Sequence, residues 1–152
     1  MPNPERMEAA VHAYVAAFDQ GDADAVAALF AEDATVEDPI GTPPHVGREA
    51  IRAFYAASME TGAKLKLDGP VRIAGPYAAF AFNVLLHYQG KDQRVDVIDT
   101  FRFNDDDLVV EMRAYFGPTN IVKREDYYYI LFAATGYKAQ KYGVCVARTQ
   151  TL

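Results

Sequence analysis

A carboxyl group stands where the sequence predicts an apolar surface. In the stretch VDVIDTFRF, residues 95–103, alternate residues share one face if the segment is a strand, because side chains in a strand alternate with period 2. Asp99 falls in the middle of the apolar row, whose other members are Val95, Val97, Phe101 and Phe103. Burial of an unpaired carboxylate is so unfavourable that the group usually binds a proton instead. We therefore expect Asp99 to be neutral and able to donate a hydrogen bond.

Two further polar residues lie in apolar rows, Tyr14 on a predicted helix and Asp38 in phase with Val36. Each has a structural alternative. A buried tyrosine commonly packs with its hydroxyl bonded to the backbone, and an Asp before Pro39 is typical of a turn. Asp99 is harder to explain structurally, because Asp is depleted in strands and almost never buried unpaired. Together the three residues favour a cavity with one carboxylate as a base and two proton donors opposite it.

Three helices are predicted in the N-terminal part of the chain. Apolar residues recur at helical spacing from Met7 to Phe18, after an N-cap at Asn3, and Gly21 ends this first helix. Asp22 or Asp24 caps a second, short helix. The predicted ranges are about Pro4–Asp19, ADAVAALF (residues 23–30) and REAIRAFYAAS (residues 48–58).

The remaining pattern alternates with period 2 and predicts strands. ATVEDPIG (residues 34–41) forms an early strand, and four later strands are separated by turn residues. These four are KLKLDGPVRIAG (64–75), YAAFAFNVLLHYQG (77–90), QRVDVIDTFRFN (93–104) and LVVEMRAYFG (108–117). The inward row of the strand over 77–90 is predicted to be Phe80, Phe82, Val84, Leu86 and Tyr88. That of the strand over 108–117 is predicted to be Val110, Met112, Ala114 and Phe116. Residues 104–107, NDDD, form a turn between two strands. We predict an α+β domain whose curved antiparallel sheet wraps the first helix and leaves a conical apolar cavity.

The bulk composition excludes several function classes. The 152 residues suffice for one domain, and 51% hydrophobic with 24% charged residues is typical of a globular protein. A formal charge of −6 argues against nucleic-acid or anionic-membrane partners, which require clustered Lys and Arg. No apolar run reaches the length of a membrane span, and the N-terminal residues do not resemble a secretory signal.

The cysteine and histidine content indicates neither a disulfide nor a metal site. Cys145 is the single cysteine, so no internal disulfide is possible and a reducing, cytoplasmic setting is expected. His12, His45 and His87 have no spacing typical of metal ligands, although His45 lies in a loop and could turn inward.

Residues 4–124 resemble bacterial delta-5-3-ketosteroid isomerases of the nuclear-transport-factor-2-like (NTF2-like) superfamily. The resemblance lies in ALFAEDATVEDPIGTPPHVGREAIRAFY, AAFAFNVLLHYQG, VDVIDTFRFN and MRAYFG. It implies a cone-shaped curved antiparallel sheet packed on three N-terminal helices, no cofactor and no metal. The implied activity moves the double bond of a 3-ketosteroid from the 5,6 to the 4,5 position. It also implies a homodimer that packs through the outer face of the sheet.

The resemblance also implies residue roles. Asp38 matches the general base that transfers a proton from carbon 4 to carbon 6 through a dienolate. Tyr14 and Asp99 match the two oxyanion donors, and Tyr55 matches a tyrosine that holds the first donor. A neutral carboxyl as a hydrogen-bond donor is already known for ketosteroid isomerases. The implied steroid cavity is lined by Phe54, Phe82, Val84, Leu86, Phe101, Met112 and Phe116.

Two positions depart from the resemblance. Phe30 stands where some members have a tyrosine that extends the hydrogen-bond chain, so a shorter network of Tyr14 and Tyr55 is expected. Leu86 stands where another member has an aromatic side chain, which changes the cavity wall.

The domain is expected to comprise residues 1–124, followed by an extension over residues 125–152. The apolar segment YYYILFAA and the later KYGVCVART fit two interpretations. One is an edge strand or hairpin that covers an apolar surface and would block the dimer face. The other is an unpartnered, aggregation-prone extension.

Two other functions compete with an isomerase, because one fold hosts many activities. A polyketide cyclase or dehydratase would use a different arrangement of His and Asp. It is disfavoured because His12, His45 and His87 do not fall in the predicted inward rows, although His45 in its loop could turn inward. A non-catalytic domain that binds a hydrophobic ligand would have no need of Asp38.

Overall fold

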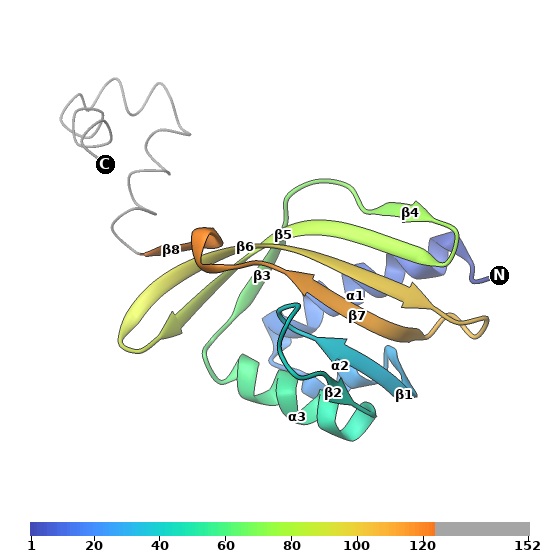
Figure 1. Ribbon diagram of the computed structural model, residues 1–152, viewed down its shortest axis with the longest axis horizontal. Coiled ribbons are helices and arrows are strands. Elements are labelled where there is room, and N and C mark those ends of the chain that lie inside the picture. Colours follow the sequence, from blue (N-terminus) through green and yellow to red (C-terminus); the bar gives the residue numbers. More distant parts are fainter. Residues whose placement is uncertain (124–152) are drawn as a thin grey trace.

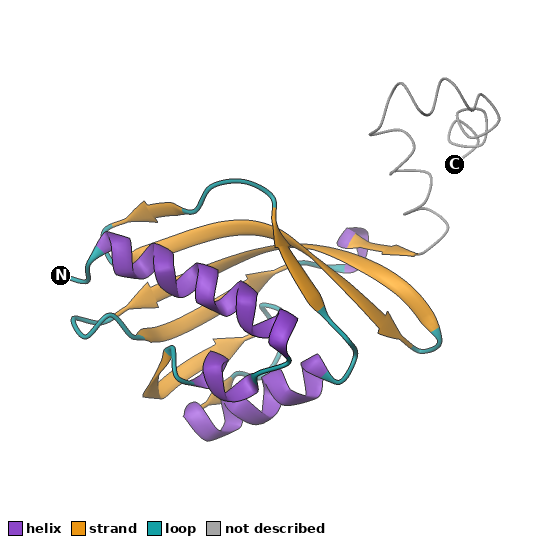
Figure 2. Cartoon of the chain, turned by 180° about the vertical axis from the view of Figure 1, so that it is seen from behind, coloured by secondary structure: helices purple, strands orange, loops and turns teal. Residues whose placement is uncertain are grey.

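The computed structural model describes residues 1–123, in which three α-helices cover one face of a curved sheet of eight strands (Figure 1 and Figure 2). The helices are α1 (Pro4–Gln20), α2 (Ala23–Ala27) and α3 (Arg48–Met59), with a short 3-10 helix at Pro118–Asn120. The strands are β1 (Phe30–Glu37), β2 (His45–Val46), β3 (Lys64–Leu67), β4 (Arg72–Ala74), β5 (Tyr77–Tyr88), β6 (Lys91–Phe103), β7 (Val109–Tyr115) and β8 (Ile121–Lys123). The predicted extension, residues 125–152, lies outside the described residues.

The sheet order is β2, β1, β7, β6, β5 and β3, with β4 paired to β5 and β8 paired to β6. The predicted α+β class and curved sheet are confirmed. The sheet is mixed rather than wholly antiparallel, because β1 and β7 run parallel. These two strands are far apart in the sequence, so no hairpin turn sets their relative direction. No helix among residues 1–123 is both long and apolar enough to cross a membrane.

Local capping fixes the ends of α1 as predicted. The Asn3 side chain accepts hydrogen bonds from the backbone N–H groups of Glu5 and Arg6 at 2.9 and 3.1 Å. Gly21 ends the helix with a φ of 63°, a left-handed conformation that glycine adopts without steric cost. Asp22 caps α2 by accepting from the Ala25 N–H at 3.0 Å. Asn3, Gly21 and Asp22 thus define both ends of α1 and the start of α2.

Three predictions, two of element bounds and one of an inward residue, were wrong. The second helix ends at Ala27 rather than Phe30, which is the first residue of β1. The segment 64–75 forms two strands instead of one, interrupted at Gly69, which has a φ of 140°, and at Pro70, which has no N–H for the ladder. A register shift in the β6–β7 pair places Val109 in the core, where Val110 was expected.

The inward rows of β5, β6 and β7 form the core together with α1 and α3. Phe101 is fully buried at its centre, with its ring centroid 5.0 Å from that of Phe80 and 6.0 Å from that of Phe30. Within residues 1–123, no α-helix covers the opposite face of these strands in either view (Figure 1 and Figure 2). The helices therefore close only the concave side of the sheet, where the polar residues predicted from the sequence lie.

Candidate functional site

A cavity of about 540 Å³ lies between α1, α3 and the concave face of β5 and β6. Four polar residues reach this cavity because of their positions on α1, α3, β6 and the end of β1. Tyr14 lies on the buried stripe of α1, and Tyr55 lies on the buried face of α3. Asp99 belongs to the inward row of β6, and Asp38 follows the last residue of β1, with a cis peptide bond to Pro39. All four side chains line this one cavity.

Tyr14 links Asp99 and Tyr55. Its hydroxyl donates to Oδ2 of Asp99 at 3.3 Å and lies 3.5 Å from the Tyr55 hydroxyl. Both distances are long for O–H···O hydrogen bonds, which centre near 2.7–2.8 Å. Oδ1 of Asp99 is buried and has no hydrogen-bond partner among the described residues. Asp99, which lines the cavity, therefore has one carboxyl oxygen without a hydrogen-bond partner among the described residues.

Burial controls the charge of these groups. Desolvation raises the pKa of Asp99 well above its usual value of 3.8, and the nearby Asp38 carboxylate raises it further. The Tyr14 hydrogen bond acts in the opposite direction but does not offset burial. Desolvation likewise raises the pKa of Tyr14 and the pKa of Tyr55. These shifts favour the protonated form of all three groups.

Asp38 differs from these three groups. Its side chain is half-buried, and desolvation raises its pKa to about 6. At neutral pH its carboxyl is therefore mostly ionised, whereas complete burial favours the protonated form of Asp99. The two carboxyl groups in one cavity thus favour different charge states, the arrangement that separates a base from an acid.

The aromatic rings around Tyr14 fix its position. The ring centroid of Tyr14 lies 5.3 Å from that of Phe101, 5.4 Å from that of Phe18 and 5.7 Å from that of Tyr55, all in edge-to-face geometry. Such pairs contribute about 0.5–1.5 kcal/mol each beyond burial of their surface. Phe30 packs against Tyr55 with centroids 6.1 Å apart. A phenyl ring has no hydroxyl, so the chain of hydroxyls stops at Tyr55 on this side.

Most of the residues expected to line the cavity do so. Its wall includes five of the seven, Phe54, Phe82, Val84, Leu86 and Phe116. Phe101 and Met112 lie behind the wall instead, fully buried in the core and outside the cavity lining. Alternation along a strand predicts which face a residue occupies, but it does not predict how deep that residue lies beneath a curved surface.

Sequence analysis did not assign nine other lining residues to the site: Phe18, Ser58, Thr61, Leu65, Tyr88, Gln93, Val95, Val97 and Ile121. Several had a usable signal. Phe18 is four residues after Tyr14 and Ser58 is three after Tyr55, so helical spacing places both on the same faces as the tyrosines. Gln93 is in phase with Asp99 on β6. Ile121 had no such signal, because β8 is too short to show a period.

The histidines and the acidic residues form no metal site within residues 1–123. His12 and His87 are exposed and lie near Glu8 and Asp92, at 3.9 and 2.9 Å. His45 is half-buried and stacks on Phe54, with ring centroids 4.3 Å apart. This contact places His45 behind a residue of the cavity wall.

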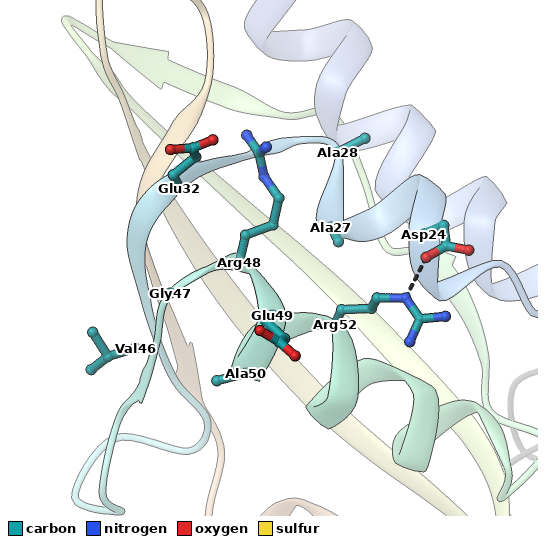
Figure 3. Close-up of a pocket in the computed structure, with 10 residues that line it drawn as sticks. All are labelled: Asp24, Ala27, Ala28, Glu32, Val46, Gly47, Arg48, Glu49, Ala50 and Arg52. Carbon is teal, nitrogen blue, oxygen red and sulfur yellow. Dashed lines mark hydrogen bonds and ion pairs between the residues drawn. The ribbon is translucent and has the colours of Figure 1, made fainter.

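A larger, more open hollow of about 750 Å³ lies beside α2 and the start of α3 (Figure 3). Its arginines are engaged in structural contacts. Arg48 donates two hydrogen bonds to the Phe30 carbonyl, and Arg52 forms an ion pair with Asp24. Glu32 and Glu49 at its rim are exposed. Since these groups hold the helices in place, we assign the candidate site to the cavity that contains Asp38 and Asp99.

Comparison with known proteins is consistent with this fold. The family described as the SnoaL-like domain matches residues 11–112. A curated protein of Nocardioides simplex named steroid delta-isomerase is 38% identical over 117 residues, which cover 76% of this chain and 94% of that protein. The solved structure of SalBIII is similar in fold, with a TM-score of 0.75, 23% identity and coverage of 81% of this chain and 99% of that one. SalBIII is described as an epoxide hydrolase/cyclase-like enzyme with a role in pyran ring formation in the polyether salinomycin.

We expect the free energy of unfolding to fall less steeply with rising pH in Asp99→Asn than in the parent. The folded state keeps Asp99 protonated because burial raises its pKa, whereas the unfolded chain ionises it near a pKa of about 3.9. Above that pH only the unfolded state releases the proton. The Asp99 contribution to the free energy of unfolding therefore falls with rising pH, by up to about 1.4 kcal/mol per pH unit, until the folded-state pKa is reached.

Urea unfolding of parent and variant at several pH values between about 5 and 7 measures this difference in slope. Asp33→Asn is the control, because it makes the same change at an exposed position of β1. Parallel pH profiles for the parent and Asp99→Asn would contradict a neutral Asp99.

Proposed function

The chain belongs to the SnoaL-like domain family, of NTF2-like fold, and we propose that it is a steroid delta-isomerase that converts delta-5-3-ketosteroids into delta-4-3-ketosteroids. One observation carries the proposal. Asp99, whose Oδ1 has no hydrogen-bond partner among the described residues, lines the same cavity as Tyr14 and Asp38. The named relative, a steroid delta-isomerase, supports the choice of substrate.

In this proposal Asp38 moves the proton. Its carboxylate takes a proton from carbon 4 of the steroid, and the electron pair released forms a dienolate. The resulting carboxylic acid then returns the proton to carbon 6, so the double bond moves and Asp38 is regenerated. A pKa of about 6 suits a base that must both accept and release a proton near neutral pH.

The dienolate oxygen needs stabilisation, because a carboxylate is a weak base for a proton beside a ketone. Asp99 donates from its neutral carboxyl, and Tyr14 donates from its hydroxyl. Removal of one such donor from a dry site typically costs about 2.7–4 kcal/mol of transition-state stabilisation. Two donors that share one oxygen need not contribute additively. Tyr55 acts on Tyr14 rather than on the ligand, by holding its hydroxyl in place.

The apolar wall binds the steroid. Phe54, Phe82 and Phe116, with the aliphatic Val84 and Leu86, present hydrocarbon to a hydrocarbon ligand. Burial of apolar surface contributes about 25 cal/mol per Å² removed from water. Exclusion of water also strengthens the hydrogen bonds from Tyr14 and Asp99, because the local dielectric constant falls.

We expect Asp38→Asn to reduce isomerisation of 5-androstene-3,17-dione by about a hundredfold or more, because an amide does not act as a base. The growth of ultraviolet absorbance from the conjugated enone measures the rate. Tyr14→Phe should lower kcat by about a hundred- to a thousandfold with little change in binding. Equilenin, a planar phenol that resembles the dienolate, should still bind to Asp38→Asn.

The control is Glu37→Gln, which changes the adjacent carboxyl on the other face of β1. A rate loss in Asp38→Asn no larger than that in Glu37→Gln would refute the base assignment. If the parent binds equilenin but forms no enone, a binding role or a different substrate replaces the isomerase proposal.

The pH dependence of kcat/KM should report the Asp38 pKa. The ionised carboxylate is the active form, so kcat/KM should rise with pH through a pKa of about 6 and then level off. Well below that pKa the rate should fall about tenfold per pH unit. A profile without an inflection on the acid side, at substrate concentrations below KM, would be incompatible with Asp38 as the base.

We also propose that two copies associate through the outer face of the sheet. Ile98 on β6 and Tyr115 on β7 are cross-strand partners there, with 49% and 44% of their surfaces exposed. Exposed apolar side chains that neighbour each other commonly mark an interface.

Sedimentation velocity should show a dimer for the parent and a monomer for Ile98→Asp, because a buried unpaired carboxylate is unfavourable. Val46→Asp is the control, since Val46 is 63% exposed on β2 at the edge of the sheet. A dimer that persists in Ile98→Asp would place the interface elsewhere.

A further inference from the structure

We propose that Gln93 determines specificity by donating a hydrogen bond to a neutral polar substituent at the end of the steroid remote from the 3-keto group. The inference rests on the proposed function, which places the 3-keto oxygen at Tyr14 and Asp99. It assigns a task to the opposite end of the same cavity, which the catalytic groups do not reach.

The inward row of β6 is polar at both ends and apolar between them. Asp99 is followed, toward the β5–β6 hairpin turn, by Val97, Val95 and then Gln93, and all four line the cavity. Gln93 pairs across the ladder with Leu86, another lining residue. Gln93 lies six positions before Asp99, about 20 Å along a strand at about 3.4 Å per residue. A long apolar ligand anchored at Asp99 therefore extends along the valines toward Gln93.

The wall that faces β6 also has polar groups at both ends. Tyr55 contributes its hydroxyl at the Asp99 end, while Ser58 and Thr61 line the cavity farther along the chain. Thr61 lies beside the Leu86–Gln93 pair, because its carbonyl accepts from the N–H of the residue after Leu86 at 3.1 Å. The Thr61 hydroxyl donates to the Ser58 carbonyl at 2.6 Å, which leaves its oxygen as an acceptor. Polar groups from two elements thus meet at the end of the cavity remote from Asp99.

The Gln93 amide has the capacity to bind a ligand. Its Nε2 lies 3.5 Å from the Tyr88 carbonyl, at the outer limit for a hydrogen bond. The side chain is half-buried, and an amide carries two N–H donors and one carbonyl acceptor. A ligand ketone or hydroxyl at a shorter distance would be a better partner than the Tyr88 carbonyl.

The charge of the cavity selects a neutral substituent. No Lys or Arg is found among the lining residues within the described part of the chain. A carboxylate or sulfate on the ligand would have no Lys or Arg among these lining residues to pair with, and the loss of its hydration would oppose binding. A carbonyl or hydroxyl oxygen requires only the hydrogen bond that Gln93 offers.

The test compares 5-androstene-3,17-dione, which has a ketone at carbon 17, with 5-androsten-3-one, which lacks it. The parent should favour the diketone in kcat/KM by about five- to tenfold, the effect of one neutral hydrogen bond. Gln93→Met keeps the length of the side chain and removes its amide. This variant should lose the preference, because its kcat/KM for the diketone should fall about five- to tenfold more than its kcat/KM for 5-androsten-3-one.

Gln20→Met is the matched control, because Gln20 is exposed at the end of α1 and does not line the cavity. It should retain the preference of the parent. Equal rate losses for both substrates in Gln93→Met, or a parent without preference, would overturn the inference.

A binding measurement separates this inference from the proposed reaction. Fluorescence titration with equilenin and with its analogue that lacks the carbon 17 ketone needs no turnover. Selective weakening of equilenin in Gln93→Met would support the role of Gln93 even if the parent forms no enone. Turnover by the parent with equal affinities for both phenols would retain the isomerase and reject the role of Gln93.

Discussion

A neutral carboxyl held in an apolar interior is the constraint on which the rest of this structure depends. Asp99 is 1% exposed, and one of its oxygens has no partner among the described residues. An unsatisfied buried polar atom costs about 1–3 kcal/mol, so the surrounding fold must supply compensating stability. The aromatic rings that pack around Tyr14 are one such source. The same exclusion of water raises the pKa of Asp38 to about 6.

The cavity is formed by two layers of side chains, one fully buried and one that lines the space. Fully buried rings such as Phe80 and Phe101 contact Tyr14 from behind and restrict its orientation. Half-buried side chains such as Phe54 and Phe116 form the surface that a ligand would contact. The first layer sets the direction of the donors and the second sets the shape of the space. Chemistry that requires alignment within fractions of an ångström depends on both.

Local signals in the sequence were sufficient to predict part of this arrangement. The cap at Asn3, the helix end at Gly21 and the inward position of Asp99 each depend on a few neighbouring residues, and the structure contains all three. Properties set by distant segments were not predictable in this way. The parallel pairing of β1 with β7 and the bulge that brings Val109 into the core depend on contacts across the sheet. The roles assigned to the site residues remain predictions.

The phenylalanine at position 30 has an electronic consequence. Hydroxyl groups in a chain polarise one another, so each added member makes the terminal hydrogen a stronger donor. In this protein the chain from Tyr14 extends to Tyr55 and then meets the hydrocarbon face of Phe30. Negative charge that develops on a ligand oxygen is consequently spread over fewer protein atoms on the tyrosine side. A larger share of the transient charge would then reside on Asp99 and on the ligand itself.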